Sequence, residues 1–528
     1  MKKVLVFTLF LTALQLFSQE QSINNLQTKE LHNNIRLNYI LIDQPDKTYD
    51  YNDGTSYKLK PSMGLFGLNY NIPLNNWLYT GAGFHGAVYG DQGGLFTLGI
   101  NLGVNTQLYK NLYFDANIHF GGGGGFRSLV NGGGIIYPNA GLQYKKNGYS
   151  FGIQYGYVNF FTGIQKGDNF SFFVEIPTTI RAASYADAQE KFIVDNVSDD
   201  EFWKKPAVKS VQQVTFDYLF PTGSTRNDGI GNFNKTTPIT QTLSLIGFEY
   251  QRYVTEKTFA YAHVDAMYSG LVAGYMDVFI GIGSNVVQTK YVNFFAKAGI
   301  GAAGGRIFPE GGLTAYPSIG ADVKFSKKFG LSLHGGYHRA VGGTFEAYTA
   351  GFSLKYYGLS GGIEDPFSDE KIIAIQTQGI RINAENQTYF DVEKQGATPS
   401  SNLQLIALKI TYDFNKRFYF AGETSFAYEG ESGGYAHGIF GLGLKSNRFL
   451  NDNFSTFLEL SGGVAGGGGI DSGPGILVRP TVGINYHISD DLSFHVAGGQ
   501  MWSPYGNVNS SNLNIGLSYG LSILKSKK

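Results

Sequence analysis

Two histidines four positions apart are the residues in this sequence that most suggest chemistry. His334 and His338 fall on one face of a predicted strand, and Ser332 lies on the same face. A serine activated by a histidine attacks ester bonds, so this group could act on lipids. The same residues could instead form a polar lining that satisfies inward-facing acids. We favour the lining, because the corresponding segments elsewhere in the chain lack the pair and no separate nucleophile motif accompanies it.

The lining would belong to a larger group of ionisable residues between positions 210 and 360. Alternation along successive strands places acids, lysines and histidines on one inner face, where opposite charges can neutralise each other. The candidate inward polar cluster consists of His263, Asp265, Lys297, Asp322, Lys324, His334 and His338, and the same face carries Asp217, Glu249, Asp277 and Lys355. No catalytic, cofactor or metal motif is present, so we expect a non-enzymatic protein without a cofactor or metal.

The elements that hold these residues are predicted to be antiparallel strands. From Phe96 to Asn105 apolar residues alternate with polar residues or glycine, which gives a strand one oily and one wet face. Extending this pattern predicts about eight strands in the first third of the chain, each close to the length that crosses a membrane. They lie near residues 34–42, 62–72, 77–89, 94–108, 111–121, 135–145, 149–160 and 169–180.

The strand pattern occurs three times. A glycine block followed by a Pro-x-x-Gly strand appears at Gly121 with Pro138, at Gly301 with Pro317, and at Gly466 with Pro480. A period near 170 residues is that of a whole domain. We therefore predict about 24 strands in three repeated units, residues 20–180, 210–360 and 372–528, with linkers at 181–209 and 361–371. The first linker contains a predicted short helix over residues 186–194.

Residues 1–19 resemble a cleaved signal peptide, because Lys2 and Lys3 precede an apolar run that ends at Phe17. Beyond it no apolar run reaches the length of a membrane-spanning helix, and the 0 Cys exclude disulfides and a lipidated cysteine. The 72 Gly, 41 Phe and 35 Tyr with only 16% charged residues suit a closed transmembrane sheet. A net charge of +0 provides no basic field, so we expect no nucleic-acid partner.

Connections of two lengths predict how the chain sits in the membrane. Turns such as Asn75-Asn76 and residues 145–148 are short, whereas residues 44–60 and 121–134 form longer, glycine-containing loops. Bacterial barrels have short periplasmic turns and long outer loops. An even number of strands in each unit would place both linkers in the periplasm.

The strands could close as three small barrels or as one wide barrel. Narrow barrels need small residues beside large ones on their inner walls, and the predicted inner face of the first unit is rich in glycine, which favours three barrels. The single wide barrel stays open, since glycine also serves bends in any sheet. The inner glycines are Gly81, Gly83, Gly99, Gly103, Gly141, Gly152 and Gly156.

Over its mature length the chain resembles outer-membrane β-barrel proteins of Gram-negative type. The resemblance is to a class, so it implies the barrel, the lipid environment and the insertion machinery as a partner, but no site residues. Such proteins usually end on an aromatic residue, whereas this chain ends in Lys525 to Lys528 after Tyr519. We expect a structural or binding platform with an unidentified surface or periplasmic partner. The alternatives are a diffusion or export pore and a lipid-modifying enzyme.

Overall fold

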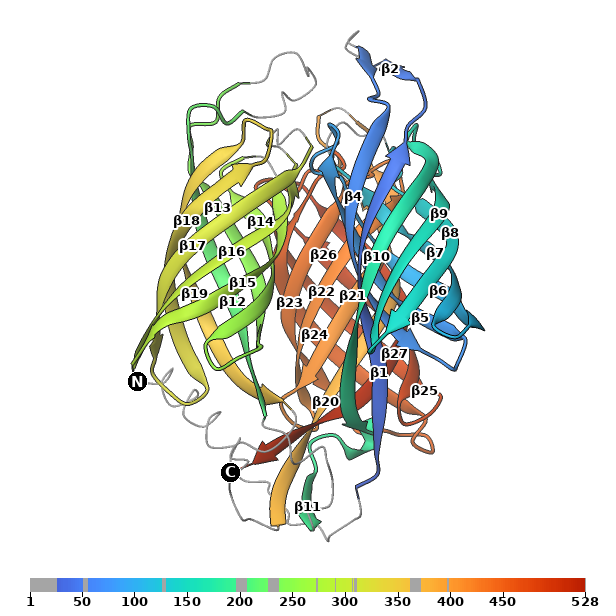
Figure 1. Ribbon diagram of the computed structural model, residues 1–528, viewed down its shortest axis with the longest axis vertical. Helices are drawn as coiled ribbons and strands as arrows, with labels where there is room; N and C mark the ends of the chain where they lie inside the picture. The colour runs from blue at the N-terminus through green and yellow to red at the C-terminus, as the bar shows by residue number, and fades with distance from the viewer. Residues whose placement is uncertain are drawn as a thin grey trace.

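The computed structural model describes most of the chain (Figure 1). The described residues are 26–50, 56–125, 130–195, 207–226, 237–271, 274–289, 291–305, 307, 311–360, 372–396 and 398–527. The predicted signal peptide, residues 196–206 of the first linker and the whole second linker lie outside these ranges.

The described chain is all-β and every strand pairing in it is antiparallel, which confirms the predicted closed antiparallel barrel structure. Among these residues, none of the helical segments has the length and hydropathy to cross a bilayer. The strand pairings close into three circuits of eight strands, which we call ring 1, ring 2 and ring 3.

Ring 1 closes because β1 pairs with both β4 and β10. Its strands are β1 (Thr28–Asp43), β4 (Ser62–Pro73), β5 (Leu78–Tyr89), β6 (Phe96–Tyr109), β7 (Leu112–Gly124), β8 (Ile135–Lys146), β9 (Tyr149–Phe160) and β10 (Lys166–Ala183). These bounds agree closely with the eight strands expected from alternation. The long loop after β1 contains a small hairpin that alternation did not predict, formed by β2 (Thr48–Asp50) and β3 (Ser56–Lys58).

Ring 2 closes through the pairing of its first and last strands, β12 and β19. Its strands are β12 (Val208–Pro221), β13 (Leu243–Tyr253), β14 (Thr258–Ser269), β15 (Met276–Gln288), β16 (Val292–Gly304), β17 (Leu313–Lys324), β18 (Phe329–Ala340) and β19 (Glu346–Ser360).

Ring 3 closes through β20 and β27 in the same way. Its strands are β20 (Ile372–Val392), β21 (Ser401–Asp413), β22 (Phe418–Glu429), β23 (Ala436–Lys445), β24 (Phe454–Gly466), β25 (Ile476–His487), β26 (Leu492–Trp502) and β27 (Asn509–Lys527).

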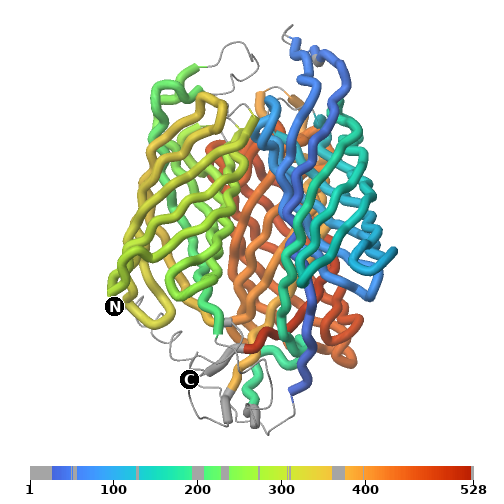
Figure 2. The backbone as a smooth tube through the Cα atoms, in the orientation of Figure 1, coloured from blue at the N-terminus to red at the C-terminus, as the bar shows by residue number. Residues whose placement is uncertain are grey.

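The three rings stand side by side, with ring 2 in yellow-green, ring 3 in orange and red, and ring 1 in blue and teal (Figures 1 and 2). Rings 1 and 3 share one continuous sheet, because the end of β10 pairs with β27 at Ala182 and Ala183. The long loops gather at one end of the rings, which we call the long-loop end. The short turns gather at the opposite, short-turn end.

The predicted helix in the first linker is wrong. The chain forms a single turn of 3-10 helix, η2 (Tyr185–Asp187), and then strand β11 (Lys191–Asp195), which pairs with the start of β20. The edge of β20 extends beyond ring 3 and offers unpaired backbone groups, so a strand is the conformation that satisfies both segments.

The ring surfaces are inverted relative to a soluble protein. Apolar side chains at alternate strand positions are exposed on the outside, whereas the residues between them are polar and buried inside. Outward-facing examples are Leu142, Ile153, Phe172, Ile300, Ile319, Leu333, Leu458, Val482 and Ile515. Exposed aromatic residues lie near both ends, with Trp77, Tyr109, Tyr149, Tyr291, Phe329 and Phe418 near the short turns and Tyr89, Phe161, Tyr348, Trp502 and Tyr505 near the long loops. This is the pattern of a surface that spans a bilayer between two aromatic belts.

Two of the glycine blocks, those that begin at Gly121 and Gly301, lie where the rings touch. Phe96 and Leu98 of ring 1, Ala302 of ring 2 and Phe426 of ring 3 form one buried cluster between the rings. Beside it the backbones approach closely, and Gly434 of ring 3 donates its N–H to the carbonyl of Gly123 in ring 1 at 3.1 Å. A Cβ added at Gly122 would lie 2.5 Å from a backbone oxygen of ring 3. The blocks therefore allow barrel walls to pack at backbone distance.

Candidate functional site

Each ring interior is filled at its long-loop end by an apolar cluster. Ring 1 gathers Ile40, Ile42, Met63, Leu65, Tyr137 and Phe160, ring 2 gathers Leu219, Leu243, Met267, Tyr275 and Phe345, and ring 3 gathers Tyr389, Leu403, Tyr435, Leu477 and Met501. Eight-stranded barrels are wide enough only for side chains to fill them. These clusters close the lumens toward the long loops.

Below its apolar cluster, ring 1 contains a buried ion group centred on Arg36. The two terminal guanidinium nitrogens of Arg36 donate to the two carboxylate oxygens of Asp115, both at 3.0 Å, and Nε donates to Glu175 at 2.9 Å. The guanidinium also lies 4.0 Å from the ring centroid of Phe173. A bidentate arginine pair of this kind fixes geometry as well as charge.

The inner glycines of ring 1 make room for this filling. A Cβ at Gly83 would lie 2.2 Å from Oδ1 of Asn69, and a Cβ at Gly152 would lie 2.2 Å from the ring of Phe173. The predicted role of glycine in a narrow wall is therefore consistent with the space available at these two positions.

Ring 3 contains a larger ion group. Glu423 accepts hydrogen bonds from two nitrogens of Arg479, at 2.8 and 2.6 Å, and Lys409 lies 3.1 Å from Glu385 and 3.6 Å from Glu459. All five side chains are buried. Their mutual pairing offsets the cost of burying charge inside the barrel.

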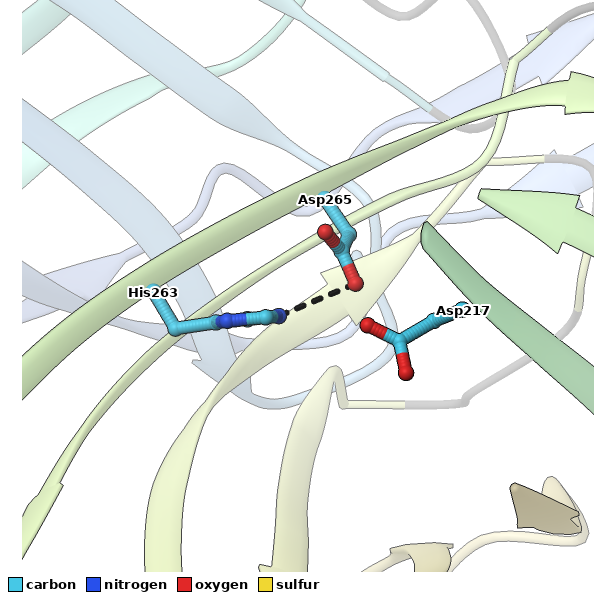
Figure 3. Close-up of side chains that lie close together, drawn as sticks. All are labelled: Asp217, His263 and Asp265. Carbon is cyan, nitrogen blue, oxygen red and sulfur yellow. Dashed lines mark ion pairs between the residues drawn. The ribbon is translucent and has the colours of Figure 1, made fainter. Parts of the chain in front are cut away.

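The interior of ring 2 brings together most of the predicted polar cluster. Nδ1 of His263 lies 3.1 Å from Glu249 and its Nε2 lies 2.9 Å from Asp265. Lys297 pairs with Glu249 at 2.5 Å. Asp217 approaches the same place from β12, as Figure 3 shows. Side chains from four strands, β12, β13, β14 and β16, therefore meet at one point in the lumen.

The remaining predicted residues separate into two groups. His334 pairs with Asp217 at 2.6 Å, and Asp322 pairs with Lys355 at 2.6 Å, so both lie inside ring 2. His338 is buried against Tyr275. Lys324 is different: it follows the inward parity, but it ends β17, where its side chain is exposed at the short-turn end. Lys324 is therefore not in contact with the cluster.

The suggested Ser/His pair does not form a nucleophile with its base. Ser332 is buried, and its hydroxyl has no hydrogen-bond partner among the described residues. His334 is engaged by Asp217 instead. The geometry agrees with the interpretation of these residues as interior lining.

Sequence reasoning missed the charged side chains at the centres of rings 1 and 3. Arg36, Asp115, Arg479 and Glu423 are charged residues at inward positions within their strands, and parity alone could have identified them. Their pairing could not be read in the same way, because Arg36 and Asp115 are 79 residues apart and meet only across the closed barrel.

The linker after ring 1 docks into the short-turn end of ring 3. The hydroxyl of Tyr185 donates to Asp413 at 2.6 Å, and the Lys445 ammonium donates to that hydroxyl at 2.6 Å. Asp491, in the turn after β25, accepts hydrogen bonds from the Tyr185 backbone N–H at 2.8 Å and from Ser184 at 2.7 Å. Partial burial would raise the pKa of Asp491, but these bonds and Lys29 lower the pKa below its ordinary value.

No family profile and no curated protein sequence matches the chain. Solved structures that match the chain at low similarity are Gram-negative outer-membrane β-barrel proteins. The ferric enterobactin receptor of Pseudomonas aeruginosa is 8% identical with a TM-score of 0.26, covering 94% of this chain and 82% of that chain. The siderophore receptor PirA of Acinetobacter baumannii is 10% identical with a TM-score of 0.26, covering 95% and 81%. OccAB3 of Acinetobacter baumannii is 10% identical with a TM-score of 0.21, covering 93% and 99%. At these TM-scores we draw no function from the similarity.

Proposed function

We propose that this chain is a non-enzymatic outer-membrane protein in which three tandem eight-stranded barrels, repeats of one unit, form an electrically closed platform. In this proposal residues 1–19 are a cleaved signal peptide, residues 20–180, 210–360 and 372–528 are the barrels, and residues 181–209 and 361–371 are periplasmic linkers. The partners are outer-membrane lipid, the barrel insertion machinery, and a protein bound by the loops or the linkers.

The observation that carries this proposal is the filling of all three lumens. Each ring combines an apolar cluster at the long-loop end with buried, mutually paired charges below it. A diffusion or export pore needs a hydrated passage, and a single wide barrel would need the strands to pair around one circuit. The three circuits of eight strands favour the platform over the pore.

The surface supports a role in presentation. Apolar side chains cover the outside of the rings, so the parts of the chain available to aqueous partners are the loops and turns at the two ends. The hairpin of β2 and β3 extends beyond the rim of ring 1 at the long-loop end (Figures 1 and 2). We propose that the long loops face the cell exterior and the linkers face the periplasm.

Conductance in planar lipid bilayers tests the closed platform. The full-length protein, inserted at the single-molecule level beside a general porin as positive control, is expected to give no steady current steps. Large steady currents with the purified protein would overturn the proposal and favour the pore.

The absence of native cysteine allows a second, independent test of orientation. Asp46 lies in the loop after β1 and Lys327 lies in the turn between β17 and β18, and both are exposed. We expect a membrane-impermeant maleimide to label Asp46→Cys in intact cells, and Lys327→Cys only after the outer membrane is permeabilised. The reverse pattern would refute the proposed orientation without affecting the conductance result.

A further inference from the structure

The interior of ring 2 contains more negative charge than its cations balance. Five buried carboxylates lie among its described residues, Asp217, Glu249, Asp265, Asp277 and Asp322, whereas the buried ammonium groups are Lys297 and Lys355. These two lysines are committed to Glu249 and Asp322. Three aspartates therefore remain with only histidines as possible counter-charges, and a dry interior does not tolerate uncompensated charge.

Three of these groups converge on one point. One ligand atom each from Asp217, His263 and Asp265 lies within 4.8 Å of the others, and the side chains point toward one another (Figure 3). Their side chains are 3%, 2% and 3% exposed, respectively. Carboxylate oxygen and imidazole nitrogen are the ligands that first-row divalent metal ions use in proteins.

The orientation of His263 suits a metal ligand. Its Nδ1 donates a hydrogen to Glu249, which directs the lone pair of neutral imidazole to Nε2. Nε2 lies 2.9 Å from Asp265 Oδ2 without forming an aligned hydrogen bond. An ion bound to both atoms at about 2.1 Å would see Nε2 of His263 and Oδ2 of Asp265 at roughly a right angle. The two atoms would then be neighbouring ligands of the same ion.

The two aspartates are oriented by further groups. His334 contacts Oδ1 of Asp217 at 2.6 Å, and the hydroxyl of Thr215 donates to Oδ1 of Asp265 at 2.8 Å. Oδ2 of Asp217 has no hydrogen-bond partner among the described residues. One oxygen of each carboxylate is thus held by a neighbouring side chain, as outer groups hold the ligands of bound metals, and Oδ2 of Asp265 faces Nε2 of His263.

Glycine provides the space that the cluster occupies. Gly247 is the register partner of Asp265, and a Cβ there would lie 1.7 Å from Oδ1 of Asp265. Gly351 is the register partner of Asp217, and a Cβ there would lie 2.3 Å from Oδ1 of Asp217. Alanine at either position would displace a member of the cluster.

We propose that Asp217, His263 and Asp265 bind one divalent first-row transition-metal ion inside ring 2, as a structural site that neutralises the excess charge and locks the barrel interior. Glu249, His334 and Thr215 position the ligands, and Asp277 lies beside Asp265 on the neighbouring strand. The site does not depend on the platform function. The competing explanation is that bound protons alone neutralise these groups.

Metal content and stability test the site on the full-length protein. The protein is purified from outer membranes without chelator, analysed by inductively coupled plasma mass spectrometry, then unfolded, stripped with EDTA and refolded in detergent with Zn²⁺ or Mn²⁺. We expect about one equivalent of metal per chain, and a higher thermal midpoint for refolded protein with metal than without it. Zn²⁺-loaded protein should show nitrogen and oxygen neighbours at about 2.0–2.2 Å by X-ray absorption.

Two variants separate the site from general effects of charge. Asp217→Asn/Asp265→Asn should lose the bound metal and the stabilisation by metal. Asp322→Asn changes a buried acid of the same barrel that is not one of the three proposed ligands, and this variant should retain both the metal and the stabilisation. Heat-modifiable gel mobility identifies the folded fraction of each variant. Wild-type protein that folds without metal and shows no change in thermal midpoint with either ion would overturn the proposal in favour of protons, as would equal metal retention by the double variant.

Discussion

The loss of unfolding free energy in the variant Arg36→Met distinguishes a dry lumen in ring 1 from a hydrated one. In ring 1 the guanidinium holds Asp115 and Glu175 at 2.9–3.0 Å, and the three side chains are 3%, 0% and 7% exposed. Removing one partner of a buried ion pair leaves the other charge uncompensated and costs about 3–5 kcal/mol. If water filled the lumen, the loss would be about 0–1 kcal/mol, as for exposed pairs. The two cases differ by more than the error of an unfolding measurement.

The free energy of unfolding can be measured by urea titration in lipid vesicles, with the fluorescence of Trp77 as a reporter on ring 1 in a version without the other two tryptophans. The matched control is Arg448→Met, because Arg448 pairs with Asp490 at 2.8 Å on the surface, where the two side chains are 28% and 58% exposed. Adding Asp115→Asn to Arg36→Met should recover part of the loss, since it removes one of the stranded charges. A loss below about 1 kcal/mol for Arg36→Met, equal to the control, would refute the closed lumen.

Three further predictions concern contacts between parts of the chain. Gly122→Leu should destabilise the protein by about 1–3 kcal/mol, because the new side chain would press on the backbone of ring 3. The thermal midpoint, followed by circular dichroism, should fall accordingly. The control Gly438→Leu should leave the midpoint unchanged, because a Cβ added there meets nothing within 4 Å. Tyr185→Phe removes the hydroxyl that bonds to buried Asp413 and half-buried Lys445 of ring 3, so hydrogen exchange in β11 should rise. No current should appear in bilayers, because the paired charged side chains of ring 3 still fill its lumen. Since the pKa of Asp491 is lowered by folding, its carboxylate stabilises the docked linker above the ordinary aspartate pKa, and this contribution is lost as the pH falls through the lowered value. The difference in thermal midpoint between wild type and Asp491→Asn should therefore be present at neutral pH and shrink in acid.

Much of the strand structure can be predicted from short stretches of the sequence. The alternation in residues 96–105 specifies both a strand and which of its faces points out of the barrel, because side chains of a strand point to opposite sides at every step. The same parity predicted an inner-face position for His263, Asp265 and Lys297, and the three side chains are buried in ring 2. It failed for Lys324, because parity does not reveal that a strand ends and that the last inward side chain reaches solvent.

The linker shows a different limit. Residues 186–194 have a composition compatible with a helix, but the free edge of β20 and the mouth of ring 3 impose a strand and a docked tyrosine. Local propensity is weak compared with the need to satisfy an exposed strand edge. The glycine blocks show the same limit. Their sequence marks a recurring feature, but only the assembled rings show that the blocks beginning at Gly121 and Gly301 are contact surfaces.

The sequence by itself predicted the alternation of inner and outer faces and the approximate bounds of the strands in the first third of the chain, since these depend on neighbours along the chain. Tertiary structure alone decided which strand closes on which, which acid meets which base, and where one barrel wall touches another. The physical reason is that hydrogen bonds between β1 and β10, or between Arg36 and Asp115, join residues more than 70 positions apart. Such contacts depend on the curvature that closes a sheet, which no short segment specifies.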